Sequence, residues 1–170
     1  MYNIMNYHNI SYPDMNNGDG LRVVLWLSGC SHKCKGCHNQ QTWDVNSGIN
    51  FDESAKKELF EELGKDYISG ITFSGGDPLH ENNINEVLEL IIEIKDKFPN
   101  KNIWLYTGYY FNEIFDEIRK QIVSKCDVLI DGRYVESLRD VSAHWVGSTN
   151  QSVIDVKKSL KENKIVLYNN

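Results

Sequence analysis

Short apolar runs alternate with longer segments of helical periodicity along most of the chain. The run from Leu21 to Leu27 is rich in strand-forming residues and ends at the turn signal Ser28-Gly29. Similar runs at Ile71–Phe73, Ile103–Tyr106 and Asp127–Ile130 also end in turns that contain glycine. Because each run is too short for an independent helix, the pattern predicts a buried strand at each of these positions.

Three segments between these strands have the apolar spacing of amphipathic helices. The first begins after Asp52, a candidate N-cap, and stops at Gly64, whereas Pro99 closes the second. We therefore expect consecutive strands to be joined by helices that each bury one face. The apolar positions are Ala55, Leu59 and Leu63 in the first helix, Ile84, Val87, Leu88, Ile91 and Ile94 in the second, and Phe111, Ile114, Phe115, Ile118 and Ile122 in the third.

Strands and helices that alternate in this way favour βα units on a parallel sheet, with right-handed crossovers. Ligands in such folds collect at the carboxyl ends of the strands. The most distinctive polar and glycine-rich segments stand at four such ends, in residues 30–37, 74–78, 106–108 and 131–132. A complete eight-stranded barrel takes about 250 residues, but the chain has 170. We therefore expect a single α/β domain over residues 1–170, an incomplete open (β/α) barrel of mostly parallel strands.

The pattern is weaker at both ends of the chain. Residues 1–17 are polar and rich in turn formers, and Met1–Tyr7 is read either as a short edge strand or as a loose terminus. After Gly132 the alternation of strand and helix fades. The segments expected there are a helical turn at 134–139, strands at 143–146 and 153–156, a short helix at 157–162 and a last strand at 165–168.

Three cysteines fall within eight residues, at Cys30, Cys34 and Cys37. We find no secretory signal segment, so disulfides are the weakest explanation. Zinc would bind the three thiols together with His32 or His38, but no second pair of ligands follows. An iron–sulfur cluster fits better, because a four-iron cube normally takes four thiolates and three leave one iron open to a substrate. Buried, unreactive cysteines are the remaining alternative.

The spacing Cys30-x3-Cys34-x2-Cys37 resembles the cluster motif of the radical S-adenosylmethionine (SAM) enzymes. Residues 17–44, which read NGDGLR at their start and CHNQQTWD at their end, are similar to the glycyl-radical-enzyme activases. Within that group they are most similar to the branch that acts on anaerobic ribonucleoside-triphosphate reductase. Many members of the superfamily carry an aromatic residue before the third cysteine, whereas Gly36 agrees with the reductase branch. The resemblance implies an open barrel of the radical SAM type.

The segment Ser74-Gly75-Gly76-Asp77-Pro78 needs its two glycines either for positive φ or for a close approach of the backbone to a ligand. Alone it reads as an ordinary turn, but beside the cysteine motif it resembles the GGEP motif that holds the amino group of SAM. Asp77 replaces the glutamate, which leaves the role of the acid open. By resemblance, Tyr106-Thr107-Gly108 passes near the SAM adenosine or ribose, although it also reads as a plain strand-to-helix turn. The backbone at Gly36, Cys37 and His38 is the expected adenine contact.

The resemblance implies that Cys30, Cys34 and Cys37 hold a [4Fe-4S] cluster whose open iron binds SAM. One electron from the reduced cluster would split SAM into methionine and a 5′-deoxyadenosyl radical, which removes hydrogen from a glycine Cα of a partner protein. The implied partner is the large subunit of anaerobic ribonucleoside-triphosphate reductase, with an electron donor such as reduced flavodoxin. Two alternatives stay open: an activase of another glycyl-radical enzyme such as pyruvate formate-lyase, and a non-catalytic zinc-binding module.

Charge and composition narrow the choice of partners. The formal net charge is −6 and no basic stretch stands out, so nucleic-acid binding is not expected. No apolar run approaches the roughly 20 residues of a membrane span, so no membrane association is expected. Free thiols without a signal segment favour the cytoplasm.

Several other residues are notable in the sequence, although no specific chemical role can be assigned to them. Arg22 is the one charge inside its strand, and it is expected to pair with a carboxylate or to contact the cluster or substrate region. Cys126 opens a predicted strand and is read as a small core residue. Asp131 and residues 147–151 resemble family segments without an assignable role. His32, His38, His80 and His144 are read as structural or surface residues rather than ligands.

Overall fold

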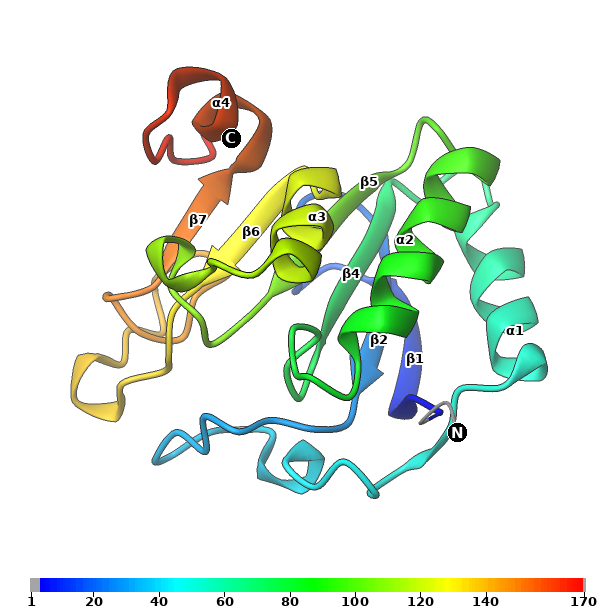
Figure 1. Cartoon of the computed structure of the whole chain (residues 1–170), viewed down its shortest axis with the longest axis horizontal. Helices are drawn as coiled ribbons and strands as arrows, with labels where there is room; N and C mark the ends of the chain where they lie inside the picture. The colour runs from blue at the N-terminus through cyan, green and yellow to red at the C-terminus, as the bar shows by residue number, and fades with distance from the viewer. Residues whose placement is uncertain (1–3, 170) are drawn as a thin grey trace.

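A computed structural model describes residues 4–169 of the chain, which adopt a mixed α/β fold. The described residues contain a seven-stranded sheet whose four middle strands run parallel to one another (Figure 1). The middle strands are β2 (Arg22–Leu27), β4 (Gly70–Gly75), β5 (Asn102–Tyr106) and β6 (Val128–Asp131), which correspond to the four strands expected from the apolar runs.

The strands on either side of this parallel core are antiparallel. On one side β1 (Asn6–Asp14) pairs with β2, and the short β3 (Ile49–Asn50) pairs with β1. On the other side β7 (Ser152–Asp155) pairs with β6. The full order is therefore β3-β1-β2-β4-β5-β6-β7. The α/β class is confirmed, whereas a sheet of mostly parallel strands is only half right, and the barrel itself is not confirmed.

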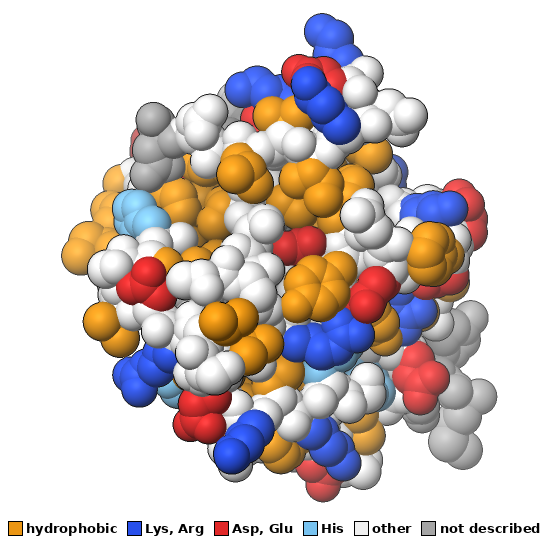
Figure 2. All heavy atoms as spheres, turned by 90° about the vertical axis from the view of Figure 1, so that its left-hand side faces the viewer, with side chains coloured by type: hydrophobic (Ala, Val, Ile, Leu, Met, Phe, Trp, Pro, Cys, Tyr) orange, Lys and Arg blue, Asp and Glu red, His pale blue; other side chains and the backbone are white. Residues whose placement is uncertain are grey.

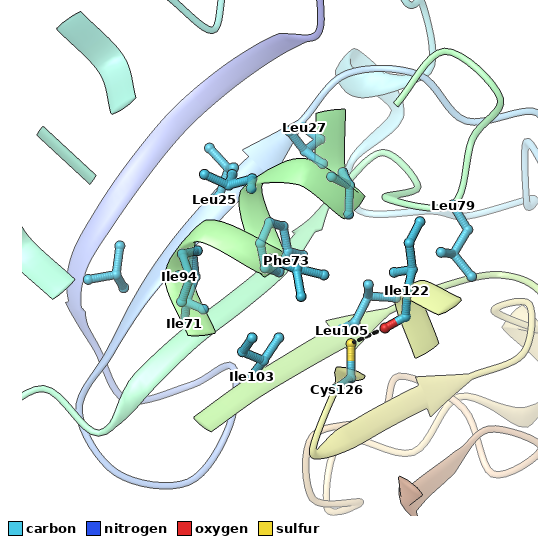
Figure 3. Close-up of a cluster of buried hydrophobic side chains, with 14 of the residues drawn as sticks. Leu25, Leu27, Ile71, Phe73, Leu79, Ile94, Ile103, Leu105, Ile122 and Cys126 are labelled. Carbon is cyan, nitrogen blue, oxygen red and sulfur yellow. Dashed lines mark hydrogen bonds between the residues drawn. The ribbon is translucent and has the colours of Figure 1, made fainter. Parts of the chain in front are cut away.

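Helices cover one face of the sheet and connect its parallel strands. In Figure 1, α2 (Ile84–Lys97) and α3 (Glu117–Lys125) lie in front of the sheet, and α1 (Glu53–Leu63) lies to the right of α2. Alternate strand residues point toward these helices, as the two-residue period of a strand requires. Figure 3 shows the resulting core, to which the strands contribute Leu25, Leu27, Ile71, Phe73, Ile103 and Leu105 and the helices Ile94 and Ile122.

Cys126 belongs to this core, as expected. Its side chain is fully buried, and its thiol donates a hydrogen bond to the carbonyl oxygen of Ile122 at 3.3 Å (Figure 3). Burial raises the pKa of the Cys126 thiol, so this sulfur stays protonated at neutral pH. It is therefore separated in both place and chemistry from the three clustered cysteines.

The helix boundaries follow the sequence signals closely where these are local. Asp52 is the N-cap of α1, and its carboxylate accepts a hydrogen bond from the backbone N–H of Ala55 at 2.9 Å. The second helix ends at Lys97, two residues before Pro99. The short helix near the C-terminus is also present, as α4 (Val156–Glu162).

Other expectations were wrong. Residues 6–14, read as polar and turn-rich, form a nine-residue strand, while Met1 to Asn3 lie outside the described residues. The third helix begins only at Glu117, after a short 3-10 helix, and Phe115 is 75% exposed rather than part of a buried stripe. The strand expected at 143–146 is a turn, and the one at 165–168 is reduced to a single bridge between Leu167 and Ile154.

Arg22 has neither of its expected partners. It lies at the start of β2, at the end of the strand opposite the cysteine loop, and its guanidinium is fully buried. It donates to the hydroxyl oxygen of Thr72 at 2.8 Å and to the side-chain carbonyl of Asn102 at 2.7 Å. The carbonyl oxygens of Ile71 and Asp19 also accept, at 2.7 and 2.9 Å. Burial lowers the pKa of Arg22 to about 10, so the group still carries its charge at neutral pH.

No helix in the described part of the chain is long and apolar enough to cross a membrane.

Replacing Arg22 with methionine should destabilise the fold without touching the cysteine loop. Buried oxygens of Thr72 and Asn102 would lose their donors, which costs about 3 kcal/mol of unfolding free energy. Urea denaturation measures this change. Lys57→Met on the exposed side of α1 is the control and should shift the free energy by less than about 0.5 kcal/mol. Equal stability of the two variants would contradict the role given to Arg22.

Candidate functional site

A cavity of about 150 Å³ opens at the carboxyl ends of the parallel strands. The cysteine loop after β2 forms one side, and the ends of β4, β5 and β6 form the rest. Sequence motifs that lie far apart in the chain therefore meet here, whereas Gly36 and His38 are not among the lining residues. Those that line the cavity are Cys30, His32, Cys34, Cys37, Asn39, Trp43, Ser74, Gly75, Gly76, Asp77, Tyr106, Thr107, Gly108, Gly132, Arg133, Tyr134 and Gln151.

If cavity volume alone decided the functional site, a different cavity would be chosen. A larger cavity, of about 650 Å³, lies between α1 and α2 and is lined mainly by carboxylates. It contains none of the cysteines and none of the glycine-rich strand ends. We regard the smaller cavity as the functional site, because only there do reactive side chains from several strand ends converge.

The backbone of the cysteine loop is closed by its own return segment. The N–H of Gly29 donates to the carbonyl of Thr42 at 2.7 Å, and that of Cys30 donates to the carbonyl of Trp43 at 3.0 Å. Between these bonds the chain turns sharply, and Gly36 has a φ of +76° that favours glycine. A side chain at Gly36 would also meet the carboxylate of Glu136 at 2.7 Å. An aromatic residue therefore does not fit at this position.

All three clustered cysteines are half-buried free thiols. Burial, reinforced by the nearby carboxylate of Asp77, raises the pKa of Cys30 to about 11. Burial also raises the pKa of Cys34. Without a cation the sulfurs of Cys30 and Cys34 therefore stay protonated, whereas a bound metal would favour the thiolates.

The donor set suits an iron–sulfur cluster better than a single ion. Three soft sulfur ligands on one loop match the ligands that hold such clusters. Among residues 4–169, no three Cys, His, Asp or Glu side chains are grouped closely enough to hold one metal ion. A four-iron cube does not require such a group, because each thiolate binds a separate iron atom. The arrangement therefore gives no support to the zinc alternative.

The two glycines at the end of β4 are required by contact with the end of β2 and the start of the cysteine loop. Gly75 has a φ of +99°, and a Cβ there would come within 2.5 Å of the backbone nitrogen of Leu27. A Cβ on Gly76 would meet the carbonyl oxygen of Gly29 at 2.5 Å. The N–H of Gly76 donates to Leu27 at 2.8 Å, and that of Asp77 to Gly29 at 2.6 Å. The glycines thus let one strand end press against the backbone that precedes Cys30.

Asp77, whose role the sequence left open, is the most heavily bonded side chain of the cavity. Its carboxylate is almost fully buried and accepts hydrogen bonds from the backbone N–H of Leu79 at 2.8 Å and of Gly108 at 3.0 Å. The hydroxyl of Thr107 lies 3.0 Å from both carboxylate oxygens. Nε2 of His32 lies 2.8 Å from Oδ2. Asp77 therefore ties the cysteine loop to the ends of β4 and β5.

His32 is a structural residue, as expected. Its ring packs edge-on against Tyr109, with ring centroids 4.6 Å apart, while its Nε2 faces Asp77. A Cβ on Gly108 would come within 2.3 Å of the imidazole. The Thr107-Gly108 pair therefore supplies both a donor to Asp77 and the space in which His32 lies.

Three lining residues follow β6, of which Arg133 and Tyr134 were missed from the sequence, whereas Gln151 stands in the segment 147–151 that resembles the family without an assigned role. The guanidinium of Arg133 pairs with Glu113 at 3.0 Å and donates to the carbonyl of Gly108 at 3.3 Å. The ring of Tyr134 lies beside that of His38, with centroids 5.7 Å apart. The side-chain amide of Gln151 donates to the carbonyl of Gly132 at 2.9 Å. For Arg133 and Tyr134 the local signal was Asp131-Gly132, a strand end at which Gly132 has a positive φ of +91°.

The comparison with known families agrees with this site. A family model described as "4Fe-4S single cluster domain" matches residues 16–154, which include the cysteine loop and the strand ends that face it. The chain therefore belongs to a family of proteins with a single [4Fe-4S] cluster domain.

The family can be stated more closely from individual relatives. The chain is 42% identical over 151 residues to the anaerobic ribonucleoside-triphosphate reductase-activating protein of Escherichia coli K12, covering 88% of this chain and 97% of the relative. It is 44% identical over 147 residues to the protein of the same name from Enterobacteria phage T4, covering 86% and 92%. The Vibrio cholerae protein of that name is 39% identical over 151 residues, covering 88% and 97%. The chain is a member of the family of anaerobic ribonucleoside-triphosphate reductase-activating proteins.

Asp77→Asn should weaken the connection between the cysteine loop and the strand ends. An amide presents an N–H₂ group to donors that now meet a carboxylate oxygen, which should cost about 2–4 kcal/mol of unfolding free energy. Urea denaturation of the metal-free protein measures the change. The control is Asp66→Asn, because Asp66 is an exposed carboxylate. If both variants unfold at the same urea concentration as the unmodified chain, the network around Asp77 does not stabilise the fold.

Proposed function

We propose that this protein is the activating enzyme of an anaerobic ribonucleoside-triphosphate reductase, and that it generates a glycyl radical on the large subunit of that enzyme. The observation that carries the proposal is the meeting of three cysteines with the glycine-rich end of β4 in one cavity. The names of the relatives, which describe activation of the same reductase, support the choice of partner.

Cys30, Cys34 and Cys37 would hold a [4Fe-4S] cluster, leaving one iron without a protein thiolate. When bound, the cluster supplies the electron that cleaves SAM into methionine and a 5′-deoxyadenosyl radical, and the cluster is itself oxidised by one electron. An external one-electron donor such as reduced flavodoxin would restore it. The protein contributes the cavity, the orientation of SAM and the surroundings of the sulfurs.

The chain's own residues would share the binding of SAM among the strand ends. The backbone of Ser74-Gly75-Gly76 lines the cavity next to the cysteine loop and is the proposed contact for the methionine end of SAM. The carboxylate of Asp77 already accepts bonds from three backbone or hydroxyl donors and faces His32. We therefore assign Asp77 to positioning rather than to a direct ion pair with the SAM amino group.

The adenosine end of SAM is proposed to lie toward β5 and β6. Tyr106 lines the cavity, and its hydroxyl is already committed because it donates to the carbonyl of Trp145 at 2.9 Å. Burial raises the pKa of this phenol, so it remains an uncharged wall of the cavity at neutral pH. Gly108 and the backbone near Cys37 and His38 are the other proposed contacts with the nucleoside.

The two alternative functions, an activase of another glycyl-radical enzyme and a non-catalytic zinc-binding module, are not equally supported. An activase of another glycyl-radical enzyme, such as pyruvate formate-lyase, would use the same chemistry on a different partner. The three relatives compared above all carry the reductase-activating name, which favours the reductase. The family model that matches the chain, described as a "4Fe-4S single cluster domain", does not favour a non-catalytic zinc module.

Cysteine variants separate the proposed ligands from the core cysteine. Cys30→Ala, Cys34→Ala and Cys37→Ala should each lose the cluster and abolish SAM cleavage. Cys126→Ala should keep both, because Cys126 is buried among apolar residues in the core between the sheet and the helices. Iron and sulfide analysis of anoxically reconstituted protein measures the cluster. Loss of iron in a folded Cys126→Ala protein would show that the proposed ligand set is wrong.

The reaction itself is tested by mixing cluster-loaded protein, dithionite and SAM without oxygen, with and without the reductase large subunit. Chromatography should detect 5′-deoxyadenosine, and electron paramagnetic resonance should detect a glycyl radical doublet on the reductase. Cleavage of SAM without the doublet would exclude this reductase and direct the search to another glycyl-radical enzyme. The absence of cleavage by fully loaded protein would overturn the proposed function.

A further inference from the structure

The segment that follows β6 projects from the molecule beside the cavity. Residues 135–149, which we name the projecting loop, extend past the end of the sheet next to the cysteine loop, in gold in Figure 1. The flanking residues Tyr134 and Gln151 line the cavity, and Glu136 approaches Gly36. The projecting loop therefore forms part of the rim through which a partner must approach.

The two arms of the projecting loop are tied together near its base. Arg139 and Ser148 form an antiparallel bridge, and the N–H of Thr149 donates to the carbonyl of Leu138 at 2.9 Å. The backbone N–H of Val135 donates to the hydroxyl of Ser148 at 3.1 Å. A loop that is closed in this way loses little conformational entropy when a partner binds to it.

The aromatic side chain of Trp145 fixes the projecting loop to the sheet. Its ring packs edge-on against Trp104 with centroids 4.8 Å apart, and its carbonyl accepts the bond from Tyr106. Trp145 also has a φ of +61°, a conformation that a bulky residue rarely adopts. Such strain persists only where the surroundings hold it, and it is concentrated at functional segments.

The outer part of this fixed loop carries apolar side chains that face solvent. Val141 is 87% exposed and Leu138 is 43% exposed. Figure 2 looks onto this side of the molecule, where hydrophobic side chains lie at the surface among charges of both signs. These two side chains belong to the loop that borders the cavity, so a protein that approaches the cavity can bury them.

We propose that the projecting loop is a docking element for the glycyl-radical enzyme, with Val141 and Leu138 buried in the complex. This inference rests on the proposed function, because the glycine must enter the cavity that the loop borders. Val141 is seven residues from Tyr134, so it lies at most about 25 Å from the cavity rim. A standard interface covers about 800 Å² on each partner, a patch roughly 32 Å across. The width of such a patch exceeds this distance, so one partner can cover both the cavity mouth and the tip of the loop when its footprint extends to this side of the mouth.

The test is a binding measurement that does not depend on the radical reaction. The double variant Leu138→Ser/Val141→Ser, in cluster-loaded protein with SAM, should bind the purified reductase large subunit at least about tenfold more weakly than the unmodified chain, because the complex would no longer remove two apolar side chains from water. Val141→Ile, which keeps an apolar tip, should bind normally. The matched control is Ile92→Ser. Ile92 is 50% exposed and lies on α2, which contributes no residue to the lining of the cavity.

The same samples separate this inference from the proposed function. Dithionite-driven SAM cleavage without reductase should be equal in the double variant and the unmodified chain, whereas the glycyl radical yield at limiting reductase should fall with binding. Equal binding by the double variant and the unmodified chain would overturn the docking role while leaving the proposed function intact. A change in self-association on sedimentation, without a change in reductase binding, would instead make the loop a contact between copies of this chain. No binding by the unmodified chain would overturn both proposals.

Discussion

The Asp77 carboxylate joins three separate parts of the chain at one point, and the geometry of the cavity depends on it. Cysteine loops are flexible unless something holds them, because few of their residues are apolar enough to be buried. Here the loop is held by the His32 ring, which lies between Asp77 and Tyr109. The donors of Thr107 and Gly108 complete the carboxylate's hydrogen bonds from the neighbouring strand. The position of the thiols is thereby linked to the ends of β4 and β5, which lie side by side in the middle of the sheet.

The same constraint explains why glycine recurs around the cavity. Gly76 and Gly108 are both positions where a Cβ would collide, in one case with the backbone of Gly29 and in the other with the ring of His32. At both positions glycine is already required by a contact within the protein, whether or not a ligand is bound. Both allow the cysteine loop to lie closer to the strand ends than any side chain would permit. What resembles a ligand-binding motif in the sequence therefore first serves to assemble the cavity wall.

Much of the fold was predictable because its signals are local. Apolar runs marked the four parallel strands, and Asp52 and Pro99 marked helix boundaries through their own backbone chemistry. β1 was missed because its register with β2 shifts between Tyr7 and Asn9, which breaks the two-residue alternation. The third helix was placed too early, because the apolar spacing of residues 111–122 matches a helix although Phe115 is exposed.

The site was predictable as a set of residues but not as a set of contacts. The cysteine spacing and the glycine-rich strand ends singled out the residues that meet in the cavity, because parallel strands bring their carboxyl ends together. The function of Asp77 depends on His32 and Thr107, which lie 45 and 30 residues away, so no local pattern carries it. The strand expected at 143–146 failed for a related reason: Trp145 takes its conformation from Trp104, 41 residues earlier in the chain.

The cavity and the projecting loop differ in how completely their side chains are buried. This difference bears on how so small a chain can act on a large partner. The cavity wall is built largely from buried polar groups that bond to one another around Asp77, although the indole nitrogen of Trp43 is buried without a partner among residues 4–169. The projecting loop is also held in place, because Trp145 packs against Trp104 of the sheet, yet it leaves apolar side chains exposed to water. A rigid site with an incompletely buried rim suits an enzyme whose substrate is a segment of another protein. The partner then supplies the reacting glycine and also buries the apolar side chains that the projecting loop leaves exposed.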